Sequence, residues 1–293
     1  MDNRTKGILS LIASTASFAC MGAMVKMTGG NIPLMEQVFF RNLVMVFIAA
    51  IWVKKHDALF FGHKGNRHLL LLRSTFGFLG VITTFYATNN LYLGDAQSLL
   101  KLSPFAVTIM AVIFLKEKIT RIRVIALISA FVGALIIINP QFNSRLFPSL
   151  IAVAAAFCAG TAYVFVSYIS RKPNKEAGFT IIFFFSAFSC IMSLPFMLYV
   201  FVKPTLLQLV QLLFIGIFAA MGQYFVTKAY SLTDASAISI FDYVGVIIAT
   251  VLGRLVFGES LKTTSYIGMI IIIGSGLISY LDVKNMKRRD ELS

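Results

Sequence analysis

The chain has 293 residues, of which 58% are hydrophobic and 13% are charged, and its mean hydropathy is +0.84. Soluble domains contain about 45–50% apolar and about 25% charged residues, so this chain has too few polar groups to cover a globular surface of its size. The composition argues against a soluble enzyme, a secreted disulfide scaffold and a disordered regulator, and it indicates a polytopic membrane protein.

Basic residues outnumber acidic ones by 26 to 12. They occur in short runs between apolar blocks, which is typical of cytoplasmic loops and not of a nucleic-acid-binding face. The three cysteines, Cys20, Cys158 and Cys190, lie inside apolar stretches without a CxxC motif. We therefore expect buried thiols, no metal site and no nucleic-acid partner.

Ten apolar blocks are long enough to span a membrane, because a helix needs about 20 residues to cross about 30 Å of hydrocarbon. In chain order they cover residues 8–27, 33–53, 69–89, 95–115, 123–139, 150–169, 179–202, 206–230, 235–257 and 264–281. The first block has a basic start but lacks a small-x-small cleavage site, so we expect a retained span. The blocks neither alternate nor have the length of about ten residues typical of barrel strands, and they predict an all-α membrane protein.

The distribution of Lys and Arg predicts the orientation of the chain. If the N-terminus is cytoplasmic, only Lys26, Arg145, Lys203 and Lys262 fall outside. Most of the other basic residues, Arg73 among them, then face the cytoplasm. Both termini are therefore expected inside a cytoplasmic (inner) membrane.

The two halves of the chain resemble each other. Leu93-Gly94-Asp95-Ala96 opens a span that ends near Glu117, and Leu232-Thr233-Asp234-Ala235 opens one that ends near Glu259. Each half contains five spans, an odd number, so the second half must be inserted upside down. Inverted repeats of this kind are a recurrent transporter architecture, with the solute site between the halves near the midplane.

Several short motifs in this order resemble the two EamA repeats of the drug/metabolite transporter superfamily. In the first half they are Phe85-Tyr86-Ala87, Gly94-Asp95-Ala96, Ser103-Pro104 and Phe114-Leu115-Lys116-Glu117; in the second half they are Phe241-Asp242-Tyr243, Gly253 and Val256-Phe257-Gly258-Glu259. Phe39-Phe40-Arg41 and Leu72-Arg73-Ser74 are similar to the subgroup of S-adenosylmethionine uptake transporters and organic-anion carriers.

This resemblance implies a fold of ten transmembrane helices in two inverted five-helix repeats. The first repeat would cover residues 1–140, the second 147–283, and residues 284–293 would form a basic cytoplasmic tail. It also implies that the fourth and ninth helices line a central cavity, and that the protein is a secondary transporter of small metabolites.

Four charged residues lie within predicted spans, where a charge costs about 2.5–3.5 kcal/mol unless it faces an aqueous cavity or a partner. They are Arg41, Lys101, Asp242 and Arg254. We expect Lys101 and Arg41 to bind an anionic group of the substrate, and Asp242 to pair with Lys101 or to bind a proton or an ammonium group. A permanent ion pair and snorkelling to the interface remain alternatives.

Acids and cations near the span ends are candidates for gating or coupling. Glu36 opens the second span, where it could neutralise Lys26, act as a gate or carry a proton, or serve as a first-turn acid at a helix N-terminus. For Arg254 we expect snorkelling, pairing with Glu259 or a gating role. Glu259 is expected to bind a loop cation or a helix end.

Polar side chains among the apolar spans are candidates for the lining of a solute site. They are Tyr86, Gln223, Tyr224 and Tyr243. The three histidines fall in one loop, with Asp57 as their neighbouring acid in sequence, and do not predict a metal site.

The sequence thus predicts a carrier of an organic anion or a zwitterion, such as an amino acid, a carboxylate or S-adenosylmethionine, that works by alternating access. No catalytic motif or cofactor-binding loop is visible in it. The alternatives are a non-transporting membrane partner or assembly subunit and a membrane-embedded lipid-modifying enzyme. Gly268, Gly274 and Gly276 on the last span predict close helix packing, either in a homodimer or within the monomer.

Overall fold

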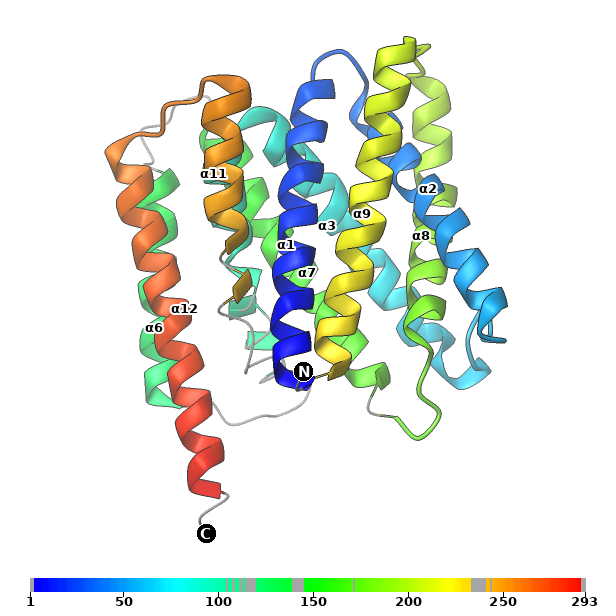
Figure 1. The fold of residues 1–293 in the computed structure, drawn as a ribbon. Coiled ribbons are helices and arrows are strands. Elements are labelled where there is room, and N and C mark those ends of the chain that lie inside the picture. The colour runs from blue at the N-terminus through cyan, green and yellow to red at the C-terminus, as the bar shows by residue number, and fades with distance from the viewer. Residues whose placement is uncertain are drawn as a thin grey trace.

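The computed structural model describes residues 3–103, 105–106, 109–110, 113, 120–138, 145–170, 172–232, 241–242 and 244–290. Over these residues the chain forms a bundle of long helices, as Figure 1 shows. Helices satisfy every backbone N–H and C=O within one segment, which a chain in hydrocarbon must do. Buried hydroxyl groups also find hydrogen-bond partners within their own helix. Ser98 donates to the carbonyl of Gly94 and Ser186 to that of Ile182, each one turn earlier.

The long helices follow the predicted blocks closely. They are α1 (Asn3–Thr28), α2 (Leu34–Lys55), α3 (Arg67–Asn90), α6 (Arg121–Ile138), α7 (Leu146–Ser170), α8 (Gly178–Tyr199), α9 (Leu206–Leu232) and α12 (Thr263–Asp290). The shorter ones are α4 (Leu93–Leu100), α11 (Val244–Phe257) and a 3-10 turn, η1 (Lys64–Asn66). Within the described residues, seven helices are long and apolar enough to cross a membrane.

One predicted span is not a continuous helix over the residues that the structure describes. The helix in the fourth block, α4, ends at Leu100, and the N–H of Lys101 bonds back to Gln97 and Ser98. The sequence favours a break here, because a proline at position 104 has no N–H for the carbonyl four residues earlier. Of the ninth block, the structure describes a 3-10 turn at Phe241–Asp242 and helix α11. The expectation of an unbroken helix over 95–115 is therefore wrong.

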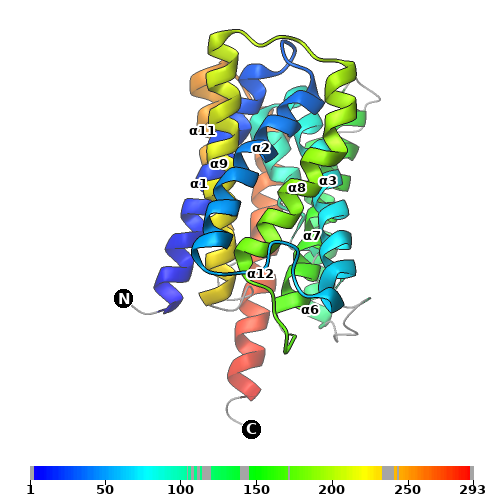
Figure 2. The same cartoon turned by 90° about the vertical axis from the view of Figure 1, so that its right-hand side faces the viewer.

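Both chain termini lie at the same end of the bundle in the two views of Figures 1 and 2. We call this end the termini end and the opposite one the far end. Helices α6 and α12 form one edge of the bundle, α2 packs against α8 and α9 toward the other edge, and α1 and α3 pack against α9 and α7 between them. Helix α4 packs against α11 and α7.

The contact between α6 and α12 depends on small side chains. Ala126, Ala130 and Ala134 are at most 1% exposed, and a Cβ on Gly268 would lie 2.6 Å from the carbonyl oxygen of Gly133. Such residues let two helix backbones approach closely in a membrane. Gly268 therefore packs within the monomer, one of the two predicted alternatives, whereas a Cβ on Gly274 would meet no atom within 4 Å.

We expect Gly268→Ala to lower the midpoint of thermal unfolding, because overpacking of a close contact costs about 1–3 kcal/mol. Gly274→Ala is the matched control on the same helix. It adds a methyl group into open space and gains up to about 1 kcal/mol of helix propensity. Unfolding of the detergent-purified variants, followed by intrinsic fluorescence, measures both, and an unchanged Gly268→Ala midpoint would contradict this packing.

A buried carboxylate joins two connections at the termini end. The side chain of Glu176, 2% exposed, accepts hydrogen bonds from the N–H of His63 at 2.9 Å and from the Asn66 amide at 2.7 Å. The His63 Nδ1 atom lies 3.0 Å from the same oxygen. The structure thus brings to His63 an acid 113 residues away in sequence, which corrects the expectation that only Asp57 neighbours the histidines.

This network determines how Glu176 responds to pH. Burial by itself raises the pKa of Glu176, but the hydrogen bonds from Asn66 and His63 outweigh it, and the pKa lies below the usual value. The folded state therefore favours the charged carboxylate. Its contribution to stability is complete above the usual glutamate pKa of about 4.3, and it is lost as the pH falls through the lowered folded-state value.

We expect Glu176→Gln to lower the unfolding midpoint at pH 7, since hydrogen bonds to a charged group contribute about 1.5–3 kcal/mol. The difference from the wild type should shrink as the pH falls below about 4. The control is Asp57→Asn, which changes an exposed acid in the connection after α2 that Glu176 contacts. It should behave as the wild type. A difference that is independent of pH would show that the Glu176 charge has no part in the effect.

Candidate functional site

The central feature of the site is an ion pair between the end of α4 and the 3-10 turn that precedes α11. The Nζ atom of Lys101 lies 2.7 Å from Oδ2 of Asp242, and the two side chains are 11% and 23% exposed. Lys101 caps the C-terminal end of α4, and Asp242 immediately precedes the region where α11 begins. Each charge thus has the sign that its helix end favours. The pairing expected from the sequence is present.

Helix α1 packs closely against the residues around Asp242. The Thr15 hydroxyl donates a 3.0 Å hydrogen bond to the backbone carbonyl of Asp242. A Cβ on Gly245 would lie 2.1 Å from the Thr15 oxygen, so only glycine allows α1 to approach α11 this closely. The hydrogen bond gives the Asp242 carbonyl a donor inside the bundle, as the membrane interior requires.

A second group of charges lies on α2 and α3. Arg41 and Arg73 are each 3% exposed, and their guanidinium carbons lie 5.6 and 4.0 Å from the ring centroid of Phe185 on α8. We call Arg41, Arg73 and Phe185 the arginine cluster. The sequence predicts that Arg41 and Lys101 together bind an anionic group, but in the structure Arg41 lies with Arg73 at the ring of Phe185.

Arg73 was missed as a site residue because it lies near the start of its apolar block and was assigned to the cytoplasmic side. The structure buries it among α3, α7 and α8 instead. The sequence did contain a signal for Arg73, since this arginine lies one helical turn inside its apolar block.

The far end is held by a different set of charges. Lys26 forms an ion pair with Glu259, whose other oxygen accepts the N–H of Leu93 at the start of α4 at 2.8 Å. Gly258 has a left-handed φ of +63°, which turns the chain directly before Glu259. Glu259 thus binds both a cation and a helix N-terminus, as expected.

For two further residues the structure excludes one of the predicted alternatives, while Glu36 does lie in the first turn of α2. Glu36 does not pair with Lys26 but accepts the N–H of Val202 at 3.2 Å, and it is fully buried with its other oxygen unbonded. Arg254 does not pair with Glu259. It is exposed and donates to the Ser260 hydroxyl at 3.3 Å.

The predicted lining residues do not converge on one point. Tyr86 packs edge-to-face against Phe147, and Gln223 is buried on α9. Tyr224 stacks on Phe179, which stacks in turn on Trp52, and none of these contacts involves the ion pair. Tyr243 lies outside the residues that the structure describes.

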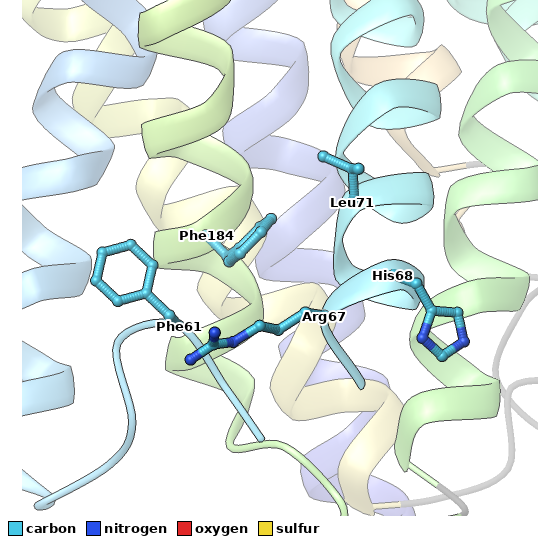
Figure 3. A pocket seen from close by; sticks show the side chains of 5 residues that line it. All are labelled: Phe61, Arg67, His68, Leu71 and Phe184. Atoms are coloured by element: carbon cyan, nitrogen blue, oxygen red, sulfur yellow. The ribbon is translucent and has the colours of Figure 1, made fainter. Parts of the chain in front are cut away.

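A separate hollow of about 370 Å³ lies near the start of α3. It is lined by Phe61, Arg67, His68, Leu71 and Phe184. In Figure 3, Arg67 extends toward Phe61, while His68 projects to the other side. Phe61 and Leu71 are 59% and 48% exposed, so the hollow opens on the outside of the bundle, apart from the ion pair and the arginine cluster.

Comparisons with known proteins agree with this architecture. A sequence model of the EamA-like transporter family matches residues 5–139 and again residues 146–281. A crystal structure of another protein superposes with a TM-score of 0.68 at 13% identity, covering 97% of this chain and 98% of the other, and shows the same fold.

Three relatives carry transporter names. The chain is 28% identical to the pseudopaline exporter of Pseudomonas aeruginosa, over 93% of this chain and 95% of the relative. It is 28% identical to the riboflavin transporter of Brucella anthropi, over 91% and 95%. It is 25% identical to the S-adenosylmethionine uptake transporter of Rickettsia bellii, over 96% and 94%. The chain is a multi-pass membrane protein that belongs to the EamA-like transporter family.

Proposed function

We propose that this protein is a secondary transporter that carries an organic anion or a zwitterion across a cytoplasmic membrane by alternating access. The observation that carries the proposal is the Lys101–Asp242 ion pair, which joins the end of α4, where the fourth span is interrupted, to the 3-10 turn that precedes α11. Discontinuous helices that meet inside a bundle are where transporters of several folds bind their solutes. The named relatives transport small polar molecules of several kinds, which supports the class of solute.

The proposed fold has ten helices in two inverted repeats, residues 1–140 and 147–283, with both termini cytoplasmic. The helix contacts support it, because three contacts between the halves occur twice with the halves exchanged: α1 with α9 and α7 with α3, α1 with α11 and α7 with α4, α2 with α9 and α8 with α3. The double family match supports the same division.

Two carboxylates give further support for the repeats. Glu36 near the start of α2 accepts an N–H from the connection after α8, and Glu176 just before α8 accepts one from the connection after α2. The first contact lies at the far end and the second at the termini end. Equivalent contacts at opposite ends are what an inverted repeat produces.

In the proposed mechanism the two halves rock about the ion pair and expose the site to one side at a time. A carboxylate of the solute competes with Asp242 for Lys101, and an ammonium group competes with Lys101 for Asp242. A zwitterion that offers both groups keeps Lys101 and Asp242 paired, whereas a simple anion frees the Asp242 carboxylate, which then needs a proton or another donor in the membrane.

We expect Lys101→Ala and Asp242→Asn each to slow solute counterflow in proteoliposomes by roughly tenfold to a hundredfold, since a charge-assisted contact is worth about 1.5–3 kcal/mol. The solutes to test are amino acids, dicarboxylates and S-adenosylmethionine. Arg254→Gln changes an exposed cation on α11; it is the control and should transport normally.

The charge-reversed double variant, Lys101→Asp with Asp242→Lys, separates a transport site from a permanent structural pair. The proposal predicts restored folding without restored transport. Normal transport by both single variants would disprove the site, and an absence of counterflow with every solute would favour the non-transporting assembly subunit.

We further propose that Glu36 carries the coupling proton, because it is fully buried and forms no ion pair among the described residues. Glu36→Gln mimics the protonated form. In this variant, solute exchange at equal pH should persist while uptake stops responding to a pH gradient across the vesicle. Loss of the gradient response in Asp242→Asn, together with its survival in Glu36→Gln, would place the proton on Asp242 instead.

A further inference from the structure

Arg41 and Arg73 combine two properties that rarely occur together in a membrane protein. Both side chains are 97% buried, since each is 3% exposed, and both approach the ring of Phe185. Nevertheless neither takes part in any of the ion pairs found among the described residues. Lys101, by contrast, forms an ion pair with Asp242.

Part of the hydrogen-bonding capacity of this cluster is unused. Among the described residues, the Nε atom of Arg41 and the Nε and Nη1 atoms of Arg73 have no hydrogen-bond partner. Arg41 donates from Nη1 to the Asn42 side chain at 2.8 Å, which is a neutral acceptor. Within the part of the chain that the structure describes, three guanidinium nitrogens are therefore buried without an acceptor, and the two arginines form no ion pair.

Phe185 accounts for how the guanidinium groups are held. An arginine over an aromatic face is attracted by the ring quadrupole, and a guanidinium 4.0 Å from the centroid, as in Arg73, is at stacking distance. Such a contact uses the face of the guanidinium and leaves its in-plane N–H groups available. The ring positions the cation but does not neutralise it.

We propose that the arginine cluster is a subsite for a carboxylate group of the solute. This inference rests on the transport function proposed above. A carboxylate is planar, has two oxygens that accept paired hydrogen bonds from guanidinium groups, and carries a single charge. Three unused donors suit its two oxygens, whereas a phosphate has more oxygens to satisfy and, as a dianion, a larger desolvation cost.

The arginine cluster and the ion pair offer a solute two separate groups of charges inside the bundle, Arg41 with Arg73 and Lys101 with Asp242. The substrate class is thus a small solute that carries at least one carboxylate.

The test is ligand-induced stabilisation of the full-length protein in phosphatidylcholine nanodiscs at constant ionic strength. The probes are succinate, glutarate and glutamate, with succinamide, glutamine and inorganic phosphate as comparisons. We expect at least one acid to raise the wild-type unfolding midpoint more than its amide or phosphate does. Arg41→Gln and Arg73→Gln should each weaken its apparent affinity by roughly tenfold to a hundredfold.

The unliganded variants provide a second measurement that a purely structural role would not give. Each substitution removes a buried, unpaired charge, so the midpoint of Arg73→Gln without ligand should equal or exceed that of the wild type. Arg67→Gln, an exposed arginine on the same helix, is the matched control and should keep wild-type affinity. A lower midpoint for unliganded Arg73→Gln would show a structural role and overturn the proposal.

Counterflow in proteoliposomes distinguishes the failure of this inference from failure of the transport proposal. If carboxylates stabilise the wild type but no solute is exchanged, the subsite stands and transport fails. If exchange depends on Lys101 and Asp242 but is equal for acids and amides in Arg41→Gln and Arg73→Gln, transport stands and the subsite is disproved. Absence of stabilisation by all three acids would likewise disprove it.

Discussion

The free-energy cost of an unpaired charge or an unsatisfied backbone group in hydrocarbon is the constraint on which this structure depends. It selects helices for the spans and directs buried hydroxyls to carbonyls one turn away. It also explains the contact in which the Thr15 hydroxyl of α1 donates to the backbone carbonyl of Asp242, next to the ion pair.

The same constraint divides the charges of the protein into two kinds. At the far end, Lys26 and Glu259 neutralise each other, and at the termini end Glu176 is satisfied by His63 and Asn66. These contacts join connections that are distant in sequence and hold the helix ends together. Inside the bundle, Lys101 and Asp242 are also paired. Arg41 and Arg73, in contrast, approach the ring of Phe185 and form no ion pair among the described residues. Their two positive charges are the strongest indication of the solute's charge.

Much of the site could be predicted because a charge within an apolar block is conspicuous in any sequence. Lys101 and Asp242 were identified in this way, and so was Arg41. Arg73 was not, because an arginine near the start of a block is equally compatible with the membrane surface. Phe185 could not be distinguished from the other 27 phenylalanines, since its importance comes only from the two guanidinium groups that approach it.

The sequence by itself determined the all-helical membrane class, the positions of the spans and the identity of most intramembrane charges, because hydropathy and charge are local properties of the chain. The tertiary structure decided which charges meet. It paired Lys26 with Glu259 instead of Glu36, placed Arg41 beside Arg73 instead of Lys101, and interrupted the fourth span. Helix packing selects partners from different helices, and no periodicity or composition of a single segment encodes that choice.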